Sequence, residues 1–316
     1  MFGGKLKYYL LMHMVIFIWG FTGVLGKLLD QETVTVHTIV FYRMLIGSAA
    51  MGLVILFTRK KITMSAKTIL QTSGTGVLIA AHWITFFLSI YYSNVSFGLI
   101  FFSTTALFTS FLEPWLMKKK FDPKELFMGA IVVGGIAIIG YDAMQQEQPE
   151  NSPNLNYTLA IICALISAFL AALFSVINAN FVKTNDSVQI TFFELTAGCL
   201  AVGAFYFFMG EFDNNELLVS SNALLMLLVL GIVCTAFAFF MGNWLMNFIT
   251  PFTMNLSVNM EPIYAIVIAL IIFKESEVMT PIFYIGAGII IAAVFLNAYF
   301  KDVRKKLNRL KETNSG

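Results

Sequence analysis

Long apolar segments recur along this chain, and their length limits the folds that it can adopt. A helix needs about 20 mainly apolar residues to cross a bilayer. Ten such segments lie near residues 8–26, 35–57, 69–91, 97–117, 125–141, 157–181, 189–209, 221–245, 251–273 and 280–300. The runs are continuous, whereas a membrane β-barrel alternates apolar and polar residues over about ten positions. The pattern predicts an all-α membrane protein with ten transmembrane helices.

The composition is consistent with lipid as the main surroundings. Charged residues make up 12% of the 316 residues and the mean hydropathy is +0.80, whereas soluble domains carry about 25% charge. The net charge of +2 gives no basis for a nucleic-acid partner. The three cysteines lie in apolar runs without metal or redox spacing, so we expect no cofactor and no metal.

The basic residues predict the orientation in the membrane. If the N-terminus is cytoplasmic, the inner segments carry 17 of the 20 lysines and arginines, and the outer loops carry only Lys27 and Lys274. This bias predicts that both termini are cytoplasmic in a multi-pass protein of the cell membrane. The first segment follows Lys5 and Lys7 without a small-residue cleavage site, so we expect it to be retained.

The longest internal polar stretch divides the helices five and five. Residues 142–156 read DAMQQEQPENSPNLN, which is typical of a linker, here predicted outside the cytoplasm. We expect a first five-helix repeat at 1–141, a second at 157–300 and a basic cytoplasmic tail at 301–316.

The second and seventh segments are similar at an offset of 151 residues. The aligned pairs are Phe41 with Phe192, Gly47 with Gly198, and Gly52 with Gly203. Because five is odd, a repeated five-helix unit must enter the membrane in the opposite orientation. Inverted repeats are typical of alternating-access transporters, whose substrate site lies near the midplane between the halves.

Three segments carry a resemblance to a known family. They are FIWGFTGVLGK (Phe17–Lys27), FYR (Phe41–Arg43) and the stretch Asn247–Glu275 with its Glu261-Pro262 step. The chain resembles EamA-type members of the drug/metabolite transporter superfamily. The resemblance covers almost the whole chain and is carried by these three segments. The first half departs from the family pattern, because Lys118–Lys120 stand where an acid normally closes the matching helix.

That resemblance implies ten helices, two inverted repeats and the export or exchange of small metabolites, often amino acids. It does not identify the substrate, because the superfamily also includes sugar-phosphate and nucleotide-sugar carriers.

Charged residues inside the predicted helices are the first candidates for function. Each costs roughly 2.5–3.5 kcal/mol at a membrane helix centre, so such residues face protein or water and often serve function. Glu261 lies near the middle of the ninth segment, and Pro262 after it favours a kink. Desolvation penalises a carboxylate, so Glu261 is a candidate proton-coupling residue. Asn255 and Asn259 lie four residues apart on one helix face and are candidates for substrate binding.

Two further charges are candidates in the corresponding helices of the two halves. Arg43 suits a carboxylate or phosphate, and the alternative is a permanent pair with Glu194 or another acid. Glu194 is a second candidate for proton coupling. His82 and Trp19 lie in the middle of their helices, where they either line the pathway or pack as structural residues. Glu113 lies close to the cytoplasmic surface, and we expect it to pair with nearby lysines.

Together these features predict a secondary transporter that exports a small polar metabolite such as an amino acid, with proton coupling. A non-transporting sensor or scaffold remains an alternative, as does a carrier of sugar- or nucleotide-type metabolites. The chain lacks the H-E-x-x-H and G-x-S-x-G motifs, so we do not expect an enzyme. The expected partners are a small-molecule substrate and the lipid bilayer.

Overall fold

A computed structural model describes most of the chain. It covers residues 3–118, 123–145, 155–209, 217–249, 260–274 and 278–293, together with 254, 257, 258, 295, 296 and 299. Within these residues every regular element is a helix. The elements are α1 (Gly3–Gln31), α2 (Val36–Phe57), α3 (Ala66–Tyr91), α4 (Val95–Phe102), α5 (Thr105–Leu116), α6 (Pro123–Gln145), α7 (Tyr157–Phe181), α8 (Ser187–Met209), α9 (Ser221–Gly231), the π-helix η1 (Ile232–Phe237), α10 (Ala238–Leu245) and α12 (Glu261–Phe273).

Most of the predicted membrane segments are helices long enough to span a bilayer. Seven stretches of the described residues have the required length and apolar composition: Leu6–Gln31, Val36–Phe57, Ala66–Tyr91, Val95–Leu116, Tyr157–Phe181, Ser187–Phe208 and Ser221–Leu245. Three shorter apolar helices occupy Phe127–Ala143, Glu261–Phe273 and Pro281–Ala293. The chain is therefore a multi-pass membrane protein. Large apolar side chains such as Phe207, Phe208 and Leu200 point outward, as expected for contact with lipid.

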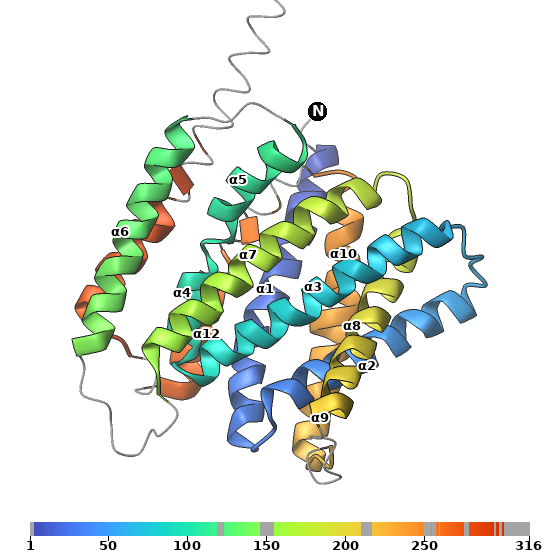
Figure 1. Cartoon of the computed structure of the whole chain (residues 1–316), viewed down its shortest axis with the longest axis horizontal. Coiled ribbons are helices and arrows are strands. Elements are labelled where there is room, and N and C mark those ends of the chain that lie inside the picture. Colours follow the sequence, from blue (N-terminus) through green and yellow to red (C-terminus); the bar gives the residue numbers. More distant parts are fainter. Residues whose placement is uncertain are drawn as a thin grey trace, which may run out of the picture.

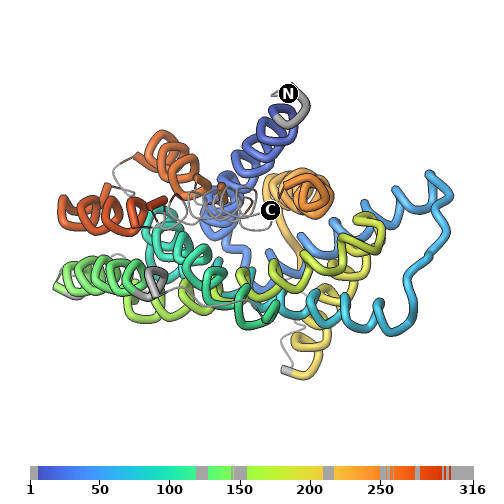
Figure 2. The backbone as a smooth tube through the Cα atoms, turned by 90° about the horizontal axis from the view of Figure 1, so that it is seen from above, coloured from blue at the N-terminus to red at the C-terminus, as the bar shows by residue number. Residues whose placement is uncertain are grey.

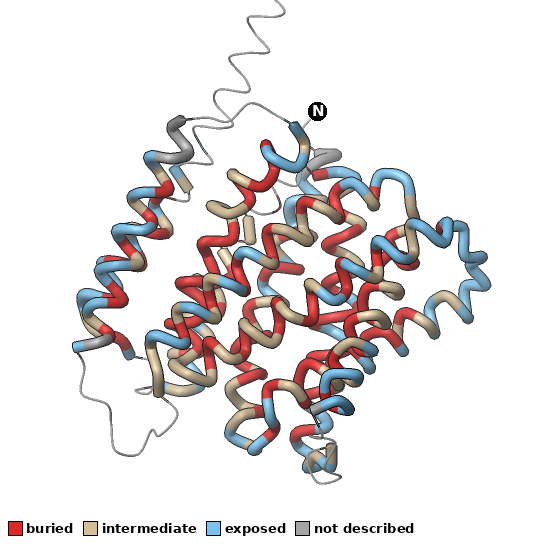
Figure 3. Tube along the Cα trace, in the orientation of Figure 1, coloured by how far each residue is buried: buried red, intermediate tan, exposed pale blue. Residues whose placement is uncertain are grey.

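The helices form two groups joined through a central set. The helix Pro281–Ala293 lies beside α6 at one edge of the bundle, α2, α8 and α9 lie at the other edge, and α1, α3 and α7 run between them (Figures 1 and 2). Contacts of α3 with α7 and α8 connect the groups. Buried residues concentrate where these central helices meet, and exposed residues face outward (Figure 3).

Helices α2 and α8 pack through a reciprocal set of contacts. A Cβ atom on Gly203 would lie 3.3 Å from Cε2 of Phe41, and one on Gly52 would lie 3.2 Å from Cε2 of Phe192. These are the residues that align at the offset of 151, and each phenylalanine covers the glycine of the other helix. Because residue numbers rise along α2 as the contacted numbers fall along α8, the two helices are antiparallel.

Glycines also set the distance between other helices. Gly135 of α6 and Gly286 of the helix Pro281–Ala293 face each other, and a Cβ on either would lie 3.3 Å from the carbonyl oxygen of the other. Gly134 and Gly288 have nothing within 4 Å and do not contribute to this contact. On α3, Gly76 is pressed against the backbone of Glu194 on α8. Only a residue without a side chain allows such an approach.

We expect Gly76→Ala to destabilise the protein by about 1–3 kcal/mol, because its Cβ would collide with backbone that cannot rotate away. Gly74→Ala is the matched control, since it lies two residues away on the same helix with open space around it. It should leave stability unchanged or raise it by up to about 1 kcal/mol. Thermal unfolding of the purified variants in detergent measures both effects. Equal melting temperatures for the two variants would contradict the proposed close contact.

Candidate functional site: a central cavity

A cavity lies at the centre of the bundle, between the two groups of helices. It offers about 110 Å³ to the centres of water-sized molecules, whereas one water needs roughly 10–15 Å³ by the same measure. The lining residues come from eight helices, from the residue after α10 and from the segment before α12, and they are Trp19, Thr22, Arg43, His82, Trp83, Phe86, Phe102, Thr105, Ala171, Phe174, Ser175, Asn178, Phe239, Gly242, Asn243, Met246, Met254, Val258 and Glu261. The space suits a small solute rather than a single water.

Several helices are interrupted at the level of the cavity. The predicted fourth segment consists of α4 and α5, separated by a break at Ser103–Thr104, and Thr105 after the break lines the cavity. The π-helix η1 separates α9 from α10. Helix α12 begins at Glu261, so Pro262 stands in its first turn, where a proline is tolerated, rather than at a kink within a continuous described helix. Interrupted helices at mid-membrane are typical of transporter binding sites, and π-helical turns often mark functional positions.

Arg43 is the buried cation of the site. Its side chain is 1% exposed, its Nε donates a hydrogen bond to Thr235 Oγ1 at 3.1 Å, and its guanidinium lies 3.6 Å from the centre of the Trp83 ring. Its Nη1 is buried without a hydrogen-bond partner. Among the described residues no ion pair joins Arg43 to Glu194 or to any other carboxylate. Arg43 thus lines the cavity with one charged donor that the described protein groups leave unsatisfied.

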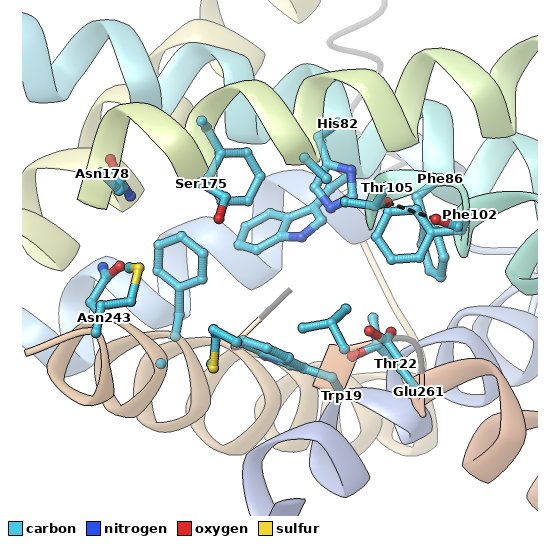
Figure 4. A pocket seen from close by; sticks show the side chains of 18 of the residues that line it. Trp19, Thr22, His82, Phe86, Phe102, Thr105, Ser175, Asn178, Asn243 and Glu261 are labelled. Carbon is cyan, nitrogen blue, oxygen red and sulfur yellow. Dashed lines mark hydrogen bonds between the residues drawn. The ribbon is translucent and has the colours of Figure 1, made fainter. Parts of the chain in front are cut away.

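Glu261 is the acidic residue of the cavity. It is 6% exposed and lies beside Thr22 at one end of the space, while Asn178 and Asn243 lie at the other end (Figure 4). Its carboxyl group interacts electrostatically with Arg43 but forms no ion pair with it. A guanidinium and a carboxyl group therefore border one space without an ion pair between them.

His82 and Trp19 also lie at the cavity. His82 Nδ1 lies 2.8 Å from Ser167 Oγ and 3.1 Å from the Ser167 carbonyl oxygen, which ties α3 to α7. The imidazole stacks on Phe102 with ring centres 5.4 Å apart. Trp19 covers Gly242, where a Cβ would lie 3.1 Å from the indole. Both the structural and the cavity-lining interpretations of His82 therefore apply to the same side chain.

Glu194 lies outside the cavity, behind its wall. It is fully buried, and its carboxyl group contacts Thr75 Oγ1 at 3.0 Å and Asn243 Nδ2 at 3.4 Å. Asn243 also donates to Thr191 Oγ1 at 3.1 Å. Asn178 interacts with the Glu194 carboxyl group without completing a well-formed hydrogen bond. Since Asn178 and Asn243 line the cavity, they connect it to Glu194.

The remaining candidates fall outside the structure or away from the cavity. Asn255 and Asn259 lie outside the described residues, although their neighbours Met254 and Val258 line the cavity. Glu113 is buried on α5 and does not line it.

The sequence did not reveal the aromatic part of the wall. Rings from α3, α4, α7 and α10 enclose the space: Trp83, Phe86, Phe102, Phe174 and Phe239. In a membrane helix the lipid-facing and inward-facing sides are both apolar, so periodicity does not separate a cavity phenylalanine from the many others. Polar cavity residues such as Asn178 and Asn243 carry a weak signal, because polar side chains also bind helices together.

A bundle of apolar helices around a central cavity with polar and aromatic walls is typical of a multi-pass membrane protein that handles a small molecule. The model of the EamA-like transporter family matches the chain twice, over residues 6–141 and 158–299. The chain belongs to this family, which confirms the resemblance seen in its sequence. The two separate matches also confirm the two-repeat architecture. The family comprises membrane transporters of small molecules, not enzymes.

Other comparisons bear on the fold alone. No curated protein matched the chain. Among solved structures 28 chains match, and one, described only as a protein crystal structure, aligns over 93% of this chain and 99% of its own. The TM-score is 0.63 at 14% identity, so this likeness shows a shared fold and nothing about substrate.

Cysteine labelling tests whether the cavity receives water-soluble molecules. In a variant with Cys163, Cys199 and Cys234 replaced by alanine, we expect Ser175→Cys to react with 2-aminoethyl methanethiosulfonate at least about tenfold faster than Ser89→Cys. Ser175 lines the cavity, whereas Ser89 is fully buried among packed helices. The mass increase of the intact protein over time gives both rates. Similar rates at the two positions would show that Ser175 does not face an accessible space.

Proposed function

We propose that this protein is a secondary transporter that exports a small amino acid or a similar zwitterion by alternating access, with proton coupling. The observation that carries the proposal is a central cavity bordered both by a guanidinium, one of whose donors has no partner among the described residues, and by a carboxyl group. A solute with one negative and one positive group complements these two charges.

The two charged residues have separate tasks in this proposal. The free donor edge of Arg43 receives the carboxylate of the solute, because a planar guanidinium presents parallel N–H groups to two oxygens. Glu261 receives the amine. Neither charge has an ion-pair partner among the described residues, so binding does not require an existing pair to be broken.

The cavity wall favours an amino acid over the alternative substrates. Arg43 is the only lysine or arginine among the described lining residues, which suits one carboxylate better than the several charges of a nucleotide. The aromatic rings provide an apolar surface for a side chain. A scaffold without transport would have no use for two unpaired charges around an enclosed space, since such charges are costly to bury.

The proposed topology is ten spans in two inverted repeats. The seven long helices and three shorter apolar helices would supply the spans. The antiparallel, reciprocal packing of α2 and α8 supports the inversion, because equivalent helices of inverted repeats run in opposite directions. With cytoplasmic termini, most lysines and arginines lie on the cytoplasmic side of the cell membrane. Rocking of the two repeats would then open the cavity to each side in turn.

Proton coupling is assigned to Glu261 and Glu194. At Glu261 a proton and the amine of the solute compete for one carboxyl group, so inward proton movement can drive export. This scheme needs no step that makes or breaks a covalent bond.

Hydrogen-bond counting supports Glu194 as the second proton carrier. The Thr75 hydroxyl lies 2.7 Å from the Thr72 carbonyl oxygen and 3.0 Å from Glu194 Oε1. A hydroxyl has one hydrogen, so Thr75 either shares it between the two oxygens or, as we propose, donates it to Thr72 and accepts a hydrogen from a protonated Glu194. A chain from Glu194 to Thr75 to the Thr72 carbonyl satisfies every group when Glu194 is protonated.

Glu261→Gln should separate coupling from transport. In proteoliposomes with a pool of labelled amino acids, we expect a pH gradient to drive flux in the wild type. The variant should lose at least about tenfold of the gradient-driven flux, because glutamine takes up no proton. Exchange should persist with weaker binding, because the glutamine carbonyl oxygen still accepts a hydrogen bond from the amine. Equal gradient-driven flux in both proteins would remove Glu261 from coupling. If no amino acid moves in the wild type, the amino-acid proposal fails and sugar- and nucleotide-type solutes take its place.

Arg43→Lys should weaken recognition of the solute carboxylate. Lysine keeps the charge but not the planar fork, so we expect half-saturation of amino-acid exchange to rise about tenfold or more. Competition by the corresponding amino-acid amides gives an internal comparison. They lack the carboxylate and should inhibit the wild type less well than the acids, and the variant should discriminate less between acid and amide. Unchanged discrimination would show that Arg43 does not bind the carboxylate.

A further inference from the structure

The orientation of Arg43 depends on a contact that no sequence motif indicates. Its guanidinium is held on two sides, by the hydrogen bond from Nε to Thr235 Oγ1 and by the face of Trp83. The Nη1 donor is left over. A guanidinium is planar, so fixing Nε and one face determines the direction of the remaining N–H groups.

The π-helix η1 explains how Thr235 can accept this hydrogen bond. Thr235 Oγ1 lies 2.8 Å from the carbonyl oxygen of Leu230, five residues earlier. The Thr235 hydroxyl donates its single hydrogen to the Leu230 carbonyl oxygen, so its oxygen lone pairs are free to accept from Arg43 Nε. An ordinary α-helical threonine bonds to the carbonyl three or four residues earlier. The wider π-helical turn thus presents an oriented acceptor to the cation.

Close packing of α2 against this segment holds the contact in place. A Cβ on Gly47 would lie 3.1 Å from the Thr235 methyl group, and one on Gly231 would lie 2.6 Å from Cβ of Ile46. Gly47 lies one turn after Arg43 on α2, and Gly231 immediately precedes η1. The two glycines therefore let α2 approach η1 closely enough for the Arg43 side chain to reach the Thr235 hydroxyl.

We propose that Thr235 is a positioning residue that orients the free edge of Arg43 toward the carboxylate of the transported molecule. The inference rests on the proposed function, because it assigns Arg43 to carboxylate recognition. Without the hydroxyl, Nε is a buried charged donor with no partner, and the guanidinium turns to satisfy it. Carboxylate recognition then weakens although Arg43 itself is unchanged.

Two substitutions separate the hydroxyl of Thr235 from its methyl group. Thr235→Val keeps the branched shape that packs on Gly47 and removes the acceptor, whereas Thr235→Ser keeps the acceptor. With pooled labelled amino acids in proteoliposomes, we expect half-saturation to rise about tenfold in the valine variant and to stay within about twofold in the serine variant. The maximal exchange rate should change little, and discrimination against amino-acid amides should fall in the valine variant only.

The control is Thr85→Val on α3. Among the described residues, the Thr85 hydroxyl donates to carbonyl oxygens of its own helix, and Thr85 does not line the cavity. The Thr85→Val variant should show the half-saturation and the discrimination of the wild type. The proposal is overturned if Thr235→Val retains wild-type half-saturation and discrimination, or if serine is as harmful as valine. If Arg43→Lys also leaves discrimination intact, the failure lies in the proposed function instead.

A second measurement needs no substrate. Thermal unfolding of Thr235→Val, Arg43→Gln and the double variant forms a mutant cycle around the contact. We expect the double variant to lose clearly less stability than the sum of the two single losses, because each single change removes the same hydrogen bond. Additive losses would overturn the proposed link between the two residues, even if no amino acid is transported.

Discussion

The structure depends on one costly feature, a buried guanidinium for which the described part of the apolar bundle provides no ion-pair partner. Burial of such a charge is tolerated only where other groups compensate it. For Arg43 the compensation comes from Thr235, from the face of Trp83 and from the more distant charge of Glu261. These groups belong to different helices, so helix packing and charge compensation constrain each other. We propose that the remaining donor of Arg43 makes the cavity selective for a negative group.

The helix contacts around this charge are set mainly by glycine. Gly47 and Gly231 bring α2 close to η1, and Gly76 brings α3 against α8. In lipid there is little hydrophobic force between helices, so association relies on close packing and on interhelical hydrogen bonds. The Glu194 cluster supplies such hydrogen bonds directly behind the cavity wall.

Much of this arrangement could be predicted from the sequence. Apolar runs of bilayer length predicted the helices, and the alignment of Phe41 with Phe192 pointed to residues that do contact the opposite helix. Buried charge singled out Arg43 and Glu261, which the structure brings to one cavity. Glu194 is the instructive exception, because it is as buried as Arg43 but faces a hydrogen-bonded cluster. The sequence indicates which charged residues are buried. Whether such a residue faces the cavity or another helix is known only when the neighbouring helices are placed.

The sequence by itself determined the class of molecule, most of the approximate spans and the charged residues that are costly to bury, and it predicts which side of each span faces the cytoplasm. Hydropathy and charge are local properties, and the bilayer converts them directly into topology. Only the tertiary structure decided which charges share a cavity, which aromatic rings enclose it and why Thr235 meets Arg43. Those relations depend on helix rotation, glycine contacts and a π-helical turn, and residues far apart in the chain set them together.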